Sequence, residues 1–270
     1  MAHASLTARW EAGQPALGGW VTGDSESTIA IYGRLGYDYV GIDTQHSPVS
    51  EAQAALLVRR LGQAPHAVIV RVSKNDAALI GRLLDAGSDG VIVPMVSTAE
   101  DAAAAVAACR YPPAGVRSFG PFRADLGLDL AELEQRVSCF VMIETAEGLA
   151  NVRQICSVPG LAGVYIGPAD LSIGLGLDPL LAFSTDQLEE PVAAIKAACA
   201  EFDLIMGSHS LNATDATRWV GRGAQLVSLG ADSVMLGTMA AQELALARGG
   251  TSGQAGPTGA DEPSSPYGGN

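Results

Sequence analysis

Short apolar runs recur along the chain, separated by stretches long enough for one helix each. Most of these runs are apolar throughout rather than alternating with polar residues, as in parallel strands covered by helices outside and packed side chains within. The runs are Trp20–Thr22, Tyr37–Asp43, Ala67–Val72, Gly90–Val96, Cys139–Glu144, Gly163–Ile166, Leu204–Ser208 and Leu226–Leu229. The pattern predicts eight strands of a parallel sheet.

The stretches between the runs carry helix-start and helix-stop residues. Thr98, Asn75 and Asn212 precede segments with helical spacing, and Gly87 follows one shortly before the next strand. The alternation predicts an α/β protein, a single (β/α)8 TIM barrel, and 270 residues suit one such domain. An open doubly wound sheet remains the alternative, because alternation alone does not prove closure.

The last residues differ in composition from the rest. Gly, Pro, Ser and Thr dominate residues 249–270, which contain almost no apolar residue. Such a segment cannot bury enough surface to offset its ordering entropy. We therefore expect a barrel over residues 1–248 and a disordered C-terminal tail over 249–270.

Charge and cysteine usage exclude some classes of protein. Sixteen basic against twenty-nine acidic residues leave a formal charge of −13, which disfavours nucleic acid and anionic membrane surfaces as partners. The N-terminus lacks the pattern of a signal peptide, and no apolar stretch reaches about 18 residues. The four cysteines lie far apart in the sequence without a CxxC pair, as expected of buried thiols. We expect a soluble, cytoplasmic protein.

Polar residues follow the predicted strands where these end. The relevant positions are Asp43-Thr44-Gln45-His46, Arg71, Glu144, Gly167-Pro168-Ala169-Asp170 and Ser208-His209-Ser210. The carboxyl ends of barrel strands meet at one mouth, where barrel enzymes carry their chemistry. These residues are therefore the candidates for an active site.

Glu144 and Asp170 are candidate metal ligands. Glu144 closes a fully apolar run, so its carboxylate needs a cation or hydrogen bonds to compensate burial. Asp170 follows 26 residues later, about one strand-helix unit, so the two should lie on adjacent strand ends. Two carboxylates with room for water suit Mg²⁺ or Mn²⁺. The alternative is that they are helix caps or a surface ion pair, although Asp170 is expected one or two residues before the next helix.

Three further side chains are candidates for acid–base chemistry and substrate binding. His46 follows Asp43 closely enough for the carboxylate to orient the imidazole and raise its basicity, as for a general base; alternatively it is a structural histidine. Arg71 suits a carboxylate or a developing enolate oxygen, whether or not it also pairs with Asp43 or Glu144. His209 is a candidate substrate contact.

Lysine usage separates two ways of activating a carbonyl substrate. A Schiff base needs a desolvated lysine near the reacting carbonyl. The chain has only Lys74, in an exposed-looking loop, and Lys196, within a predicted helix. A metal-stabilised enolate is therefore favoured over an imine.

Five stretches carry a family resemblance over about residues 16–245: YDYVGIDTQHSP, VIVRVSKNDAALIGRLLDAGSDGVIVPMV, CRYPPAGVRSFGP, VMIETAEGLANV and VYIGPADLSIGLG. The chain resembles the metal-dependent class II pyruvate aldolases of the HpcH/HpaI group, such as 4-hydroxy-2-oxoheptanedioate and 2-keto-3-deoxy-rhamnonate aldolases. The resemblance implies that pyruvate and an aldehyde are the substrates. It also implies a homo-oligomer, a hexamer built as a trimer of dimers that exchange the last helix.

The resemblance also assigns roles to residues. Glu144 and Asp170 would hold Mg²⁺ or Mn²⁺, with Co²⁺ as a further candidate, and waters would complete the octahedron. His46, paired with Asp43, would be the acid–base group, and Arg71 would contact the keto or enolate oxygen. The backbone amides of Ala169 and Asp170 would bind the pyruvate carboxylate.

Two positions depart from the pattern of many family members. Gln45 stands where many have Glu, and Met142 stands where many have Gln. The first change removes a negative charge near the metal-bound water, and the second removes a polar contact to the substrate or metal, so both bear on substrate choice and rate. Two rivals to the aldolase therefore stay open: an acyl-CoA lyase of the malyl- or citramalyl-CoA type, and a metal-binding homologue with little turnover.

Overall fold

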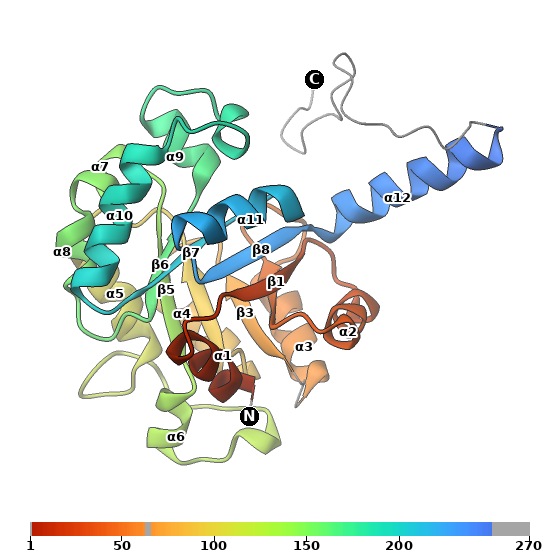
Figure 1. Cartoon of the computed structure of the whole chain (residues 1–270). Helices are drawn as coiled ribbons and strands as arrows, with labels where there is room; N and C mark the ends of the chain where they lie inside the picture. The colour runs from red at the N-terminus through yellow and green to blue at the C-terminus, as the bar shows by residue number, and fades with distance from the viewer. Residues whose placement is uncertain (1, 63–65, 250–270) are drawn as a thin grey trace. The chain divides into compact units, whose positions relative to one another are not determined.

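Eight parallel strands close into a barrel in chain order, with β8 hydrogen-bonded to β1 (Figure 1). The computed structural model describes residues 2–62 and 66–249. The strands are β1 Ala16–Val21, β2 Tyr39–Asp43, β3 Ala67–Arg71, β4 Gly90–Val93, β5 Ser138–Ile143, β6 Gly163–Ile166, β7 Ile205–Ser208 and β8 Leu226–Ala231. Closure confirms the predicted (β/α)8 barrel and rules out the open sheet. All eight predicted strands are present, although β1 begins four residues earlier than expected.

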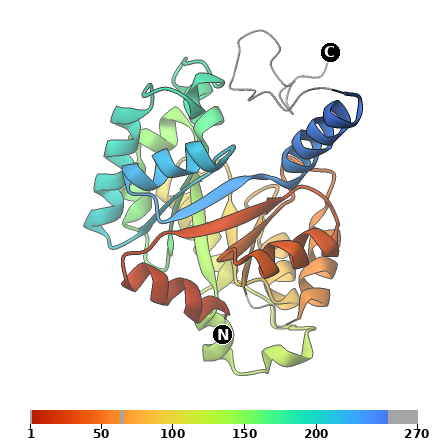
Figure 2. The same cartoon turned by 45° about the vertical axis from the view of Figure 1, so that its right-hand side comes forward.

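Helices alternate with the strands, and those between β1 and β8 surround the barrel (Figures 1 and 2). Two 3₁₀ turns, η1 Ala124–Leu126 and η2 Leu181–Phe183, lie in the longer connections. The α-helices are α1 Ala2–Glu11, α2 Glu26–Leu35, α3 Glu51–Leu61, α4 Ala77–Ala86, α5 Ala99–Cys109, α6 Leu130–Gln135, α7 Ala146–Ala150, α8 Val152–Cys156, α9 Pro168–Gly174, α10 Glu189–Glu201, α11 Ala213–Arg222 and α12 Asp232–Ala247.

The predicted helix ends are largely correct. Thr98 and Asn212 cap α5 and α11 through their side chains, and Gly87 ends α4 in the left-handed region. The prediction for α4 was wrong by one residue, because Asp76 and not Asn75 is its N-cap. The carboxylate of Asp76 accepts hydrogen bonds from the backbone amides two and three residues further on, and its negative charge is favourable at the N-terminus of a helix.

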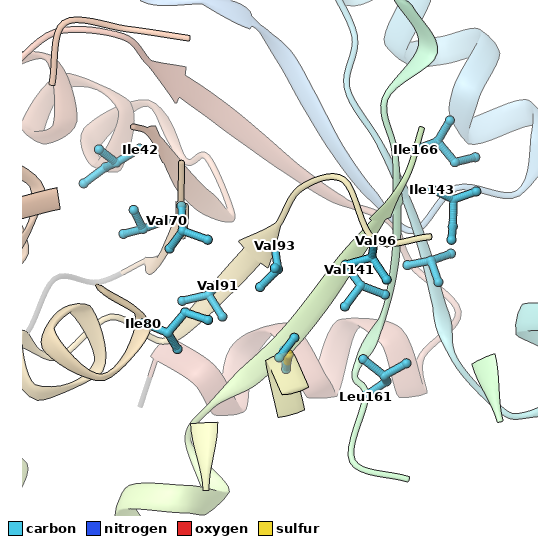
Figure 3. Packing of buried hydrophobic residues seen from close by; sticks show 14 of the residues in the cluster. Ile42, Val70, Ile80, Val91, Val93, Val96, Val141, Ile143, Leu161 and Ile166 are labelled. Atoms are coloured by element: carbon cyan, nitrogen blue, oxygen red, sulfur yellow. The ribbon is translucent and has the colours of Figure 1, made fainter. Parts of the chain in front are cut away.

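Strand residues alternate between two apolar layers. Outward residues such as Ile42, Val70 and Val141 pack with the helices (Figure 3). Inward residues fill the barrel: Ala16, Trp20, Tyr39, Ala67, Ile69, Ile92, Phe140, Met142, Tyr165 and Leu226. Helix α1 adds Leu6 to this inner cluster. Because side chains alternate along a strand, the next inward position at the carboxyl end of each strand faces the mouth.

The four cysteines are buried and free. Although far apart in the sequence, they lie in the fold as two neighbouring pairs, Cys109 with Cys139 and Cys156 with Cys199. No helix in the described residues is long and apolar enough to cross a membrane.

The chain divides into two units, Met1–Val234 and Met235–Asn270. The described part of the second unit is helical as far as Ala247 and exposes apolar side chains, with Leu236 at 72% and Met239 at 57% exposure. The predicted tail lies outside the described residues from residue 250 onward.

Candidate active site

The inward rows of β2, β3 and β5 end in charged residues. Asp43 continues the inward row of Tyr39, Arg71 that of Ile69, and Glu144 that of Met142. All three charged side chains are buried, at 2%, 6% and 2% exposure. Asp43 and Arg71 are register partners across β2 and β3. The mouth of the barrel therefore collects charge on top of an apolar interior.

Asp43 and Arg71 form a bidentate ion pair. The Arg71 Nε donates to Asp43 Oδ1 at 2.9 Å and Nη2 donates to Oδ2 at 2.6 Å. Burial raises the pKa of Asp43, but Arg71 and two backbone amides outweigh it, so the pKa is lowered overall. The ion pair with Asp43 that the sequence left open for Arg71 is present, and it fixes the plane of the guanidinium.

Trp20 forms a platform beside this pair. The Arg71 guanidinium carbon lies 5.3 Å from the Trp20 ring centroid, within cation–π range. The β1–β8 register shifts between Gly18 and Trp20, the kind of irregularity that re-aims a side chain. Gly41 makes room for the ring, since a Cβ there would lie 2.4 Å from Trp20. Our sequence reasoning missed Trp20 as a site residue; the glycine at position 41 was the available signal.

His46 lies at the rim with an exposed side chain. Its backbone amide donates to Asp43 Oδ1 at 3.3 Å, so the carboxylate holds the backbone of this loop. Desolvation of the partly covered ring and the Arg71 cation lower the pKa of His46, and they outweigh the opposing charges of Asp43 and Asp170. Asp43 raises the pKa of His46, in the expected direction, but this effect is smaller than the lowering by burial and by Arg71, so the imidazole is less basic overall.

Gln45 donates its backbone amide to Asp43 Oδ1 at 3.0 Å. Its side-chain carbonyl oxygen is buried and lacks a hydrogen-bond partner among residues 2–62 and 66–249. A buried acceptor of this kind needs a proton donor or a cation from outside the chain.

Glu144 is held by one oxygen and left open at the other. Oε1 accepts the backbone amide of Met95 at 2.6 Å, whereas Oε2 is buried and has no hydrogen-bond partner in the described part of the chain. Met95 has a φ of +57°, which is uncommon for a residue with a side chain and turns its amide toward Glu144. The pKa of Glu144 is raised to about 7, chiefly by burial and in smaller part by the charge of Asp170. The hydrogen bond from the Met95 amide and the Arg71 cation act in the opposite direction and lower it.

Gly167 gives Glu144 its space. A Cβ at this position would lie 2.5 Å from Glu144 Oε2 and 3.0 Å from the terminal methyl of Met142. Met142 is 1% exposed and belongs to the inner cluster. The side of the Glu144 carboxylate toward the barrel interior is therefore apolar, and only glycine fits at position 167.

Asp170 lies within helix α9, at its third residue, and not before it. The prediction was wrong because Pro168 begins the helix, where its fixed φ is favourable and its missing amide costs nothing. Gly167 is the N-cap without a side-chain bond, so Asp170 is not a cap either. The amides of Ala169 and Asp170 belong to the first turn, where backbone N–H groups lack helical acceptors.

His209 lies beside Trp20 at the mouth of the barrel. Its ring meets Trp20 edge-on at 5.1 Å, and Nδ1 lies 3.1 Å from Ser228 Oγ on β8. Burial lowers the pKa of His209 to about 3, with the Arg71 cation as the next cause. The ring is therefore neutral throughout the physiological range.

Neither lysine is buried on a strand, as predicted. Lys74 is 68% exposed and lies 3.5 Å from the Asp76 carboxylate, and Lys196 is exposed on α10. An imine-forming lysine is not offered by either position.

The donor set at the mouth fits a hard divalent cation. The described residues contain no group of three or more His, Cys, Asp or Glu side chains arranged to hold a metal. The mouth instead offers Glu144, with its unpartnered buried oxygen, and Asp170, whose charge raises the pKa of Glu144. A cation between the two carboxylates would offset both their mutual repulsion and the cost of burying the Glu144 charge, and water or substrate would supply the other ligands.

Comparisons with known proteins identify the family of the chain. Residues 17–237 match the family HpcH/HpaI aldolase/citrate lyase. A hydroxypyruvate/pyruvate aldolase of Rhizorhabdus wittichii is 38% identical over 88% of this chain and 96% of its own length. A 4-hydroxy-2-oxo-heptane-1,7-dioate aldolase of Salmonella arizonae is 33% identical over 84% of this chain and 88% of its own.

A solved structure has the same fold. The HpcH/HpaI aldolase from Desulfitobacterium hafniense superposes with a TM-score of 0.81 at 26% identity, covering 90% of this chain and 96% of that one. The family match spans the whole barrel, and the relatives at 38% and 33% identity are named aldolases. The chain therefore belongs to the HpcH/HpaI aldolase/citrate lyase family, and it is a carbon–carbon lyase.

Proposed function

We propose that this lyase is a divalent-metal-dependent aldolase that forms and cleaves 4-hydroxy-2-oxo acids from pyruvate and an aldehyde. The observation that carries the proposal is the buried Glu144 oxygen that has no hydrogen-bond partner among the described residues, on a carboxyl group that is within the electrostatic reach of Asp170 and of the Arg71 cation. The aldolase names of the relatives support the reaction class.

Glu144 and Asp170 would hold the ion. Oxygen ligands favour Mg²⁺ or Mn²⁺, and Co²⁺ is a further candidate. When bound, the ion would polarise the keto group of a 2-oxo acid and so acidify the neighbouring carbon. The apolar floor of Met142 below the carboxylates limits access of water from the barrel interior.

Arg71 stabilises the charge that develops on the keto oxygen. Its bidentate pairing with Asp43 uses two of the five N–H donors of the guanidinium and keeps the group in one plane above Trp20. A cation fixed in advance does not need to reorganise during the reaction, which is the basis of electrostatic catalysis.

His46 moves the proton. A neutral imidazole removes a proton from C3 of pyruvate, and the resulting enolate carbon bonds to the aldehyde carbonyl carbon, whose oxygen gains a proton to become the 4-hydroxyl. Cleavage is the reverse and begins with loss of the 4-hydroxyl proton to the base. The lowered pKa of His46 keeps the imidazole neutral and able to accept a proton near pH 7.

The remaining residues of the mouth orient the substrate. The amides of Ala169 and Asp170, in the first turn of α9, suit the pyruvate carboxylate. Gln45 offers a side-chain carbonyl oxygen that has no hydrogen-bond partner within the described part of the chain, and His209 contacts the substrate on the side of Trp20.

Exchange of the C3 protons of pyruvate with deuterated water tests the proposal without knowledge of the aldehyde. We expect exchange with Mg²⁺ or Mn²⁺ that stops with EDTA, and that is lost in Glu144→Gln and Asp170→Asn. Exchange that survives EDTA would contradict metal dependence. Absence of exchange with every metal would overturn the aldolase proposal.

Absence of exchange would leave two rivals. An acyl-CoA lyase would cleave malyl-CoA or citramalyl-CoA, and a homologue without turnover would cleave neither while still binding the ion. A CoA-release assay with both thioesters distinguishes them.

We also propose a homo-oligomer, with the hexamer implied by the family resemblance as its form. The support in this chain is α12, which carries Leu236 and Met239 exposed to water, because exposed apolar surface of this extent marks an association site. Light scattering measures the state, and a monomer would contradict the proposal. The acidic composition and the buried free thiols support a cytoplasmic location.

A further inference from the structure

The loop between β4 and α5 carries the amide that holds Glu144. Met95 lies in this loop with a φ of +57°, and its amide donates to Glu144 Oε1 at 2.6 Å. A residue with a side chain keeps such a conformation only where its surroundings fix it. Met95 is 57% exposed, so the fixing contacts come from its neighbours in the loop rather than from its own side chain.

Val96 anchors the loop to β5 and to the helix after it. The side chain is 1% exposed and belongs with Val141 and Ile143 to the outer apolar cluster (Figure 3). The carbonyl oxygen of Val96 lies against α7, because a Cβ at Gly148 would be only 2.7 Å from it. The glycine therefore lets the backbone of the loop approach the helix that follows Glu144.

Ser97 ties the loop to the same segment by hydrogen bonds. Its hydroxyl lies 2.8 Å from the hydroxyl of Thr145, the residue directly after Glu144. Its carbonyl oxygen accepts a hydrogen bond from Asn151 Nδ2 at 2.9 Å, and its amide donates to Asp101 Oδ2 at 3.2 Å. The position of the loop is thus coupled to the residues on either side of the Glu144 carboxylate in space.

Asn151 directs its side chain to this loop instead of to its own helix. It is the N-cap of α8, a position where an asparagine side chain usually binds the first helix amides, but it makes no such bond. The same residue ends α7. Its contact with Ser97 therefore fixes the loop to the junction between the two helices.

These contacts bear on the oxygen of Glu144 that is open to an ion. Glu144 Oε2 is buried and has no hydrogen-bond partner among residues 2–62 and 66–249. Its direction depends on the bond that the other oxygen makes with the Met95 amide. Without the contacts of Ser97, Met95 can leave the left-handed region, and its amide then turns away from Glu144. Contacts that orient a metal ligand control the affinity about 10–100-fold.

We propose that Ser97 and Asn151 are positioning residues of the metal site, which hold Met95 in its left-handed conformation and so fix Glu144 for a divalent cation. Both act through the Met95 amide, since neither is a hydrogen-bond partner of Glu144. The inference rests on the proposed metal-dependent function.

Calorimetric titration of the metal-free protein with Mn²⁺ tests the effect on affinity. Ser97→Ala and Asn151→Leu should each lower the affinity about tenfold. Ser97→Thr keeps the hydroxyl and should stay within about threefold of the wild type. Because both residues hold one loop, the double variant should lose less affinity than the product of the two single losses.

Ser157→Ala is the matched control. Ser157 is the C-cap of α8, and its hydroxyl donates to the Gln154 carbonyl oxygen at 2.7 Å. This variant also loses one serine hydrogen bond in the segment after β5, but at the end of α8 that is remote from Ser97. It should bind Mn²⁺ like the wild type, which separates positioning from a general loss of stability.

Hydrogen exchange of the Met95 amide provides a readout that needs neither metal nor activity. In the metal-free protein, exchange should become at least about tenfold faster in Ser97→Ala and in Asn151→Leu, and should be unchanged in Ser157→Ala. Wild-type Mn²⁺ affinity in both loop variants, or wild-type exchange of the Met95 amide in both, would overturn the inference. Mn²⁺ binding by the wild type that survives unchanged in Glu144→Gln would instead overturn the proposed metal site.

Discussion

Gly167→Ala is the most direct test of how the site is built. The added Cβ would lie 2.5 Å from Glu144 Oε2 and 3.0 Å from the Met142 methyl, both below van der Waals contact. Met142 is 1% exposed and Glu144 is 2% exposed, so neither side chain can turn out into solvent to relieve these contacts. Overpacking of a buried site costs about 1–3 kcal/mol, and we expect a loss of that size in the free energy of unfolding.

The same substitution should weaken metal binding. Displacing a ligand by a fraction of an ångström disturbs the site as the loss of an orienting contact does, which lowers metal affinity about 10–100-fold. Urea unfolding of the metal-free protein measures the stability, and calorimetric titration with Mn²⁺ measures the affinity. In a Glu144→Ala background the obstructing carboxylate is gone, so the stability cost should shrink by at least about 0.5 kcal/mol.

Gly81→Ala is the matched control. Gly81 lies within α4 and a Cβ there would meet nothing within 4 Å. Alanine is the better helix former, so this variant should gain about 0.5–1 kcal/mol in stability. If Gly167→Ala unfolds and binds Mn²⁺ like the wild type, the close packing of β6 against Glu144 is not as described.

Three further predictions concern the charged groups. Asp43→Asn removes the counter-charge of the buried Arg71, so the free energy of unfolding in urea should fall by about 3–5 kcal/mol. Because the pKa of Asp43 is lowered in the folded state, the stability that Asp43 contributes is present above its ordinary pKa and is lost as pH falls below it. An acid unfolding profile of the variant that equals that of the wild type would contradict the pairing. The free energy of unfolding of the metal-free protein should fall by about 3 kcal/mol as pH rises from below the ordinary pKa of Glu144 through its folded value of about 7. Glu144→Gln or added Mn²⁺ should abolish this dependence of stability on pH. An equally steep dependence in the variant would assign it to another group. His46→Ala should stay folded by circular dichroism and exchange pyruvate protons about 10²–10⁴-fold more slowly, and an undiminished rate would remove His46 as the base.

Much of the fold could be predicted from the sequence because its signals are local. Alternation of apolar runs with capped helices predicts a barrel, and Thr98, Asn212 and Gly87 act on amides and carbonyls within a few residues. The inward direction of Glu144 is equally local, because alternation along β5 places it on the same face as Met142.

Only the tertiary structure determined how these residues act on one another. Trp20 joins Arg71 because β1 closes the barrel against β8 with a register shift. Ser228 reaches His209 across 19 positions of the chain. The pKa of His46 depends on burial, on Asp43 three residues before it, and on the charges of Arg71 and Asp170 from two other segments.

The sequence by itself therefore determined which residues face the mouth, because side-chain direction follows from the position within a strand. The fold alone decided which of them pair, which oxygen of Glu144 stays open and which side chains surround His209. Those outcomes depend on distances between segments that only barrel closure brings together, and electrostatic and hydrogen-bond energies change over a few ångströms.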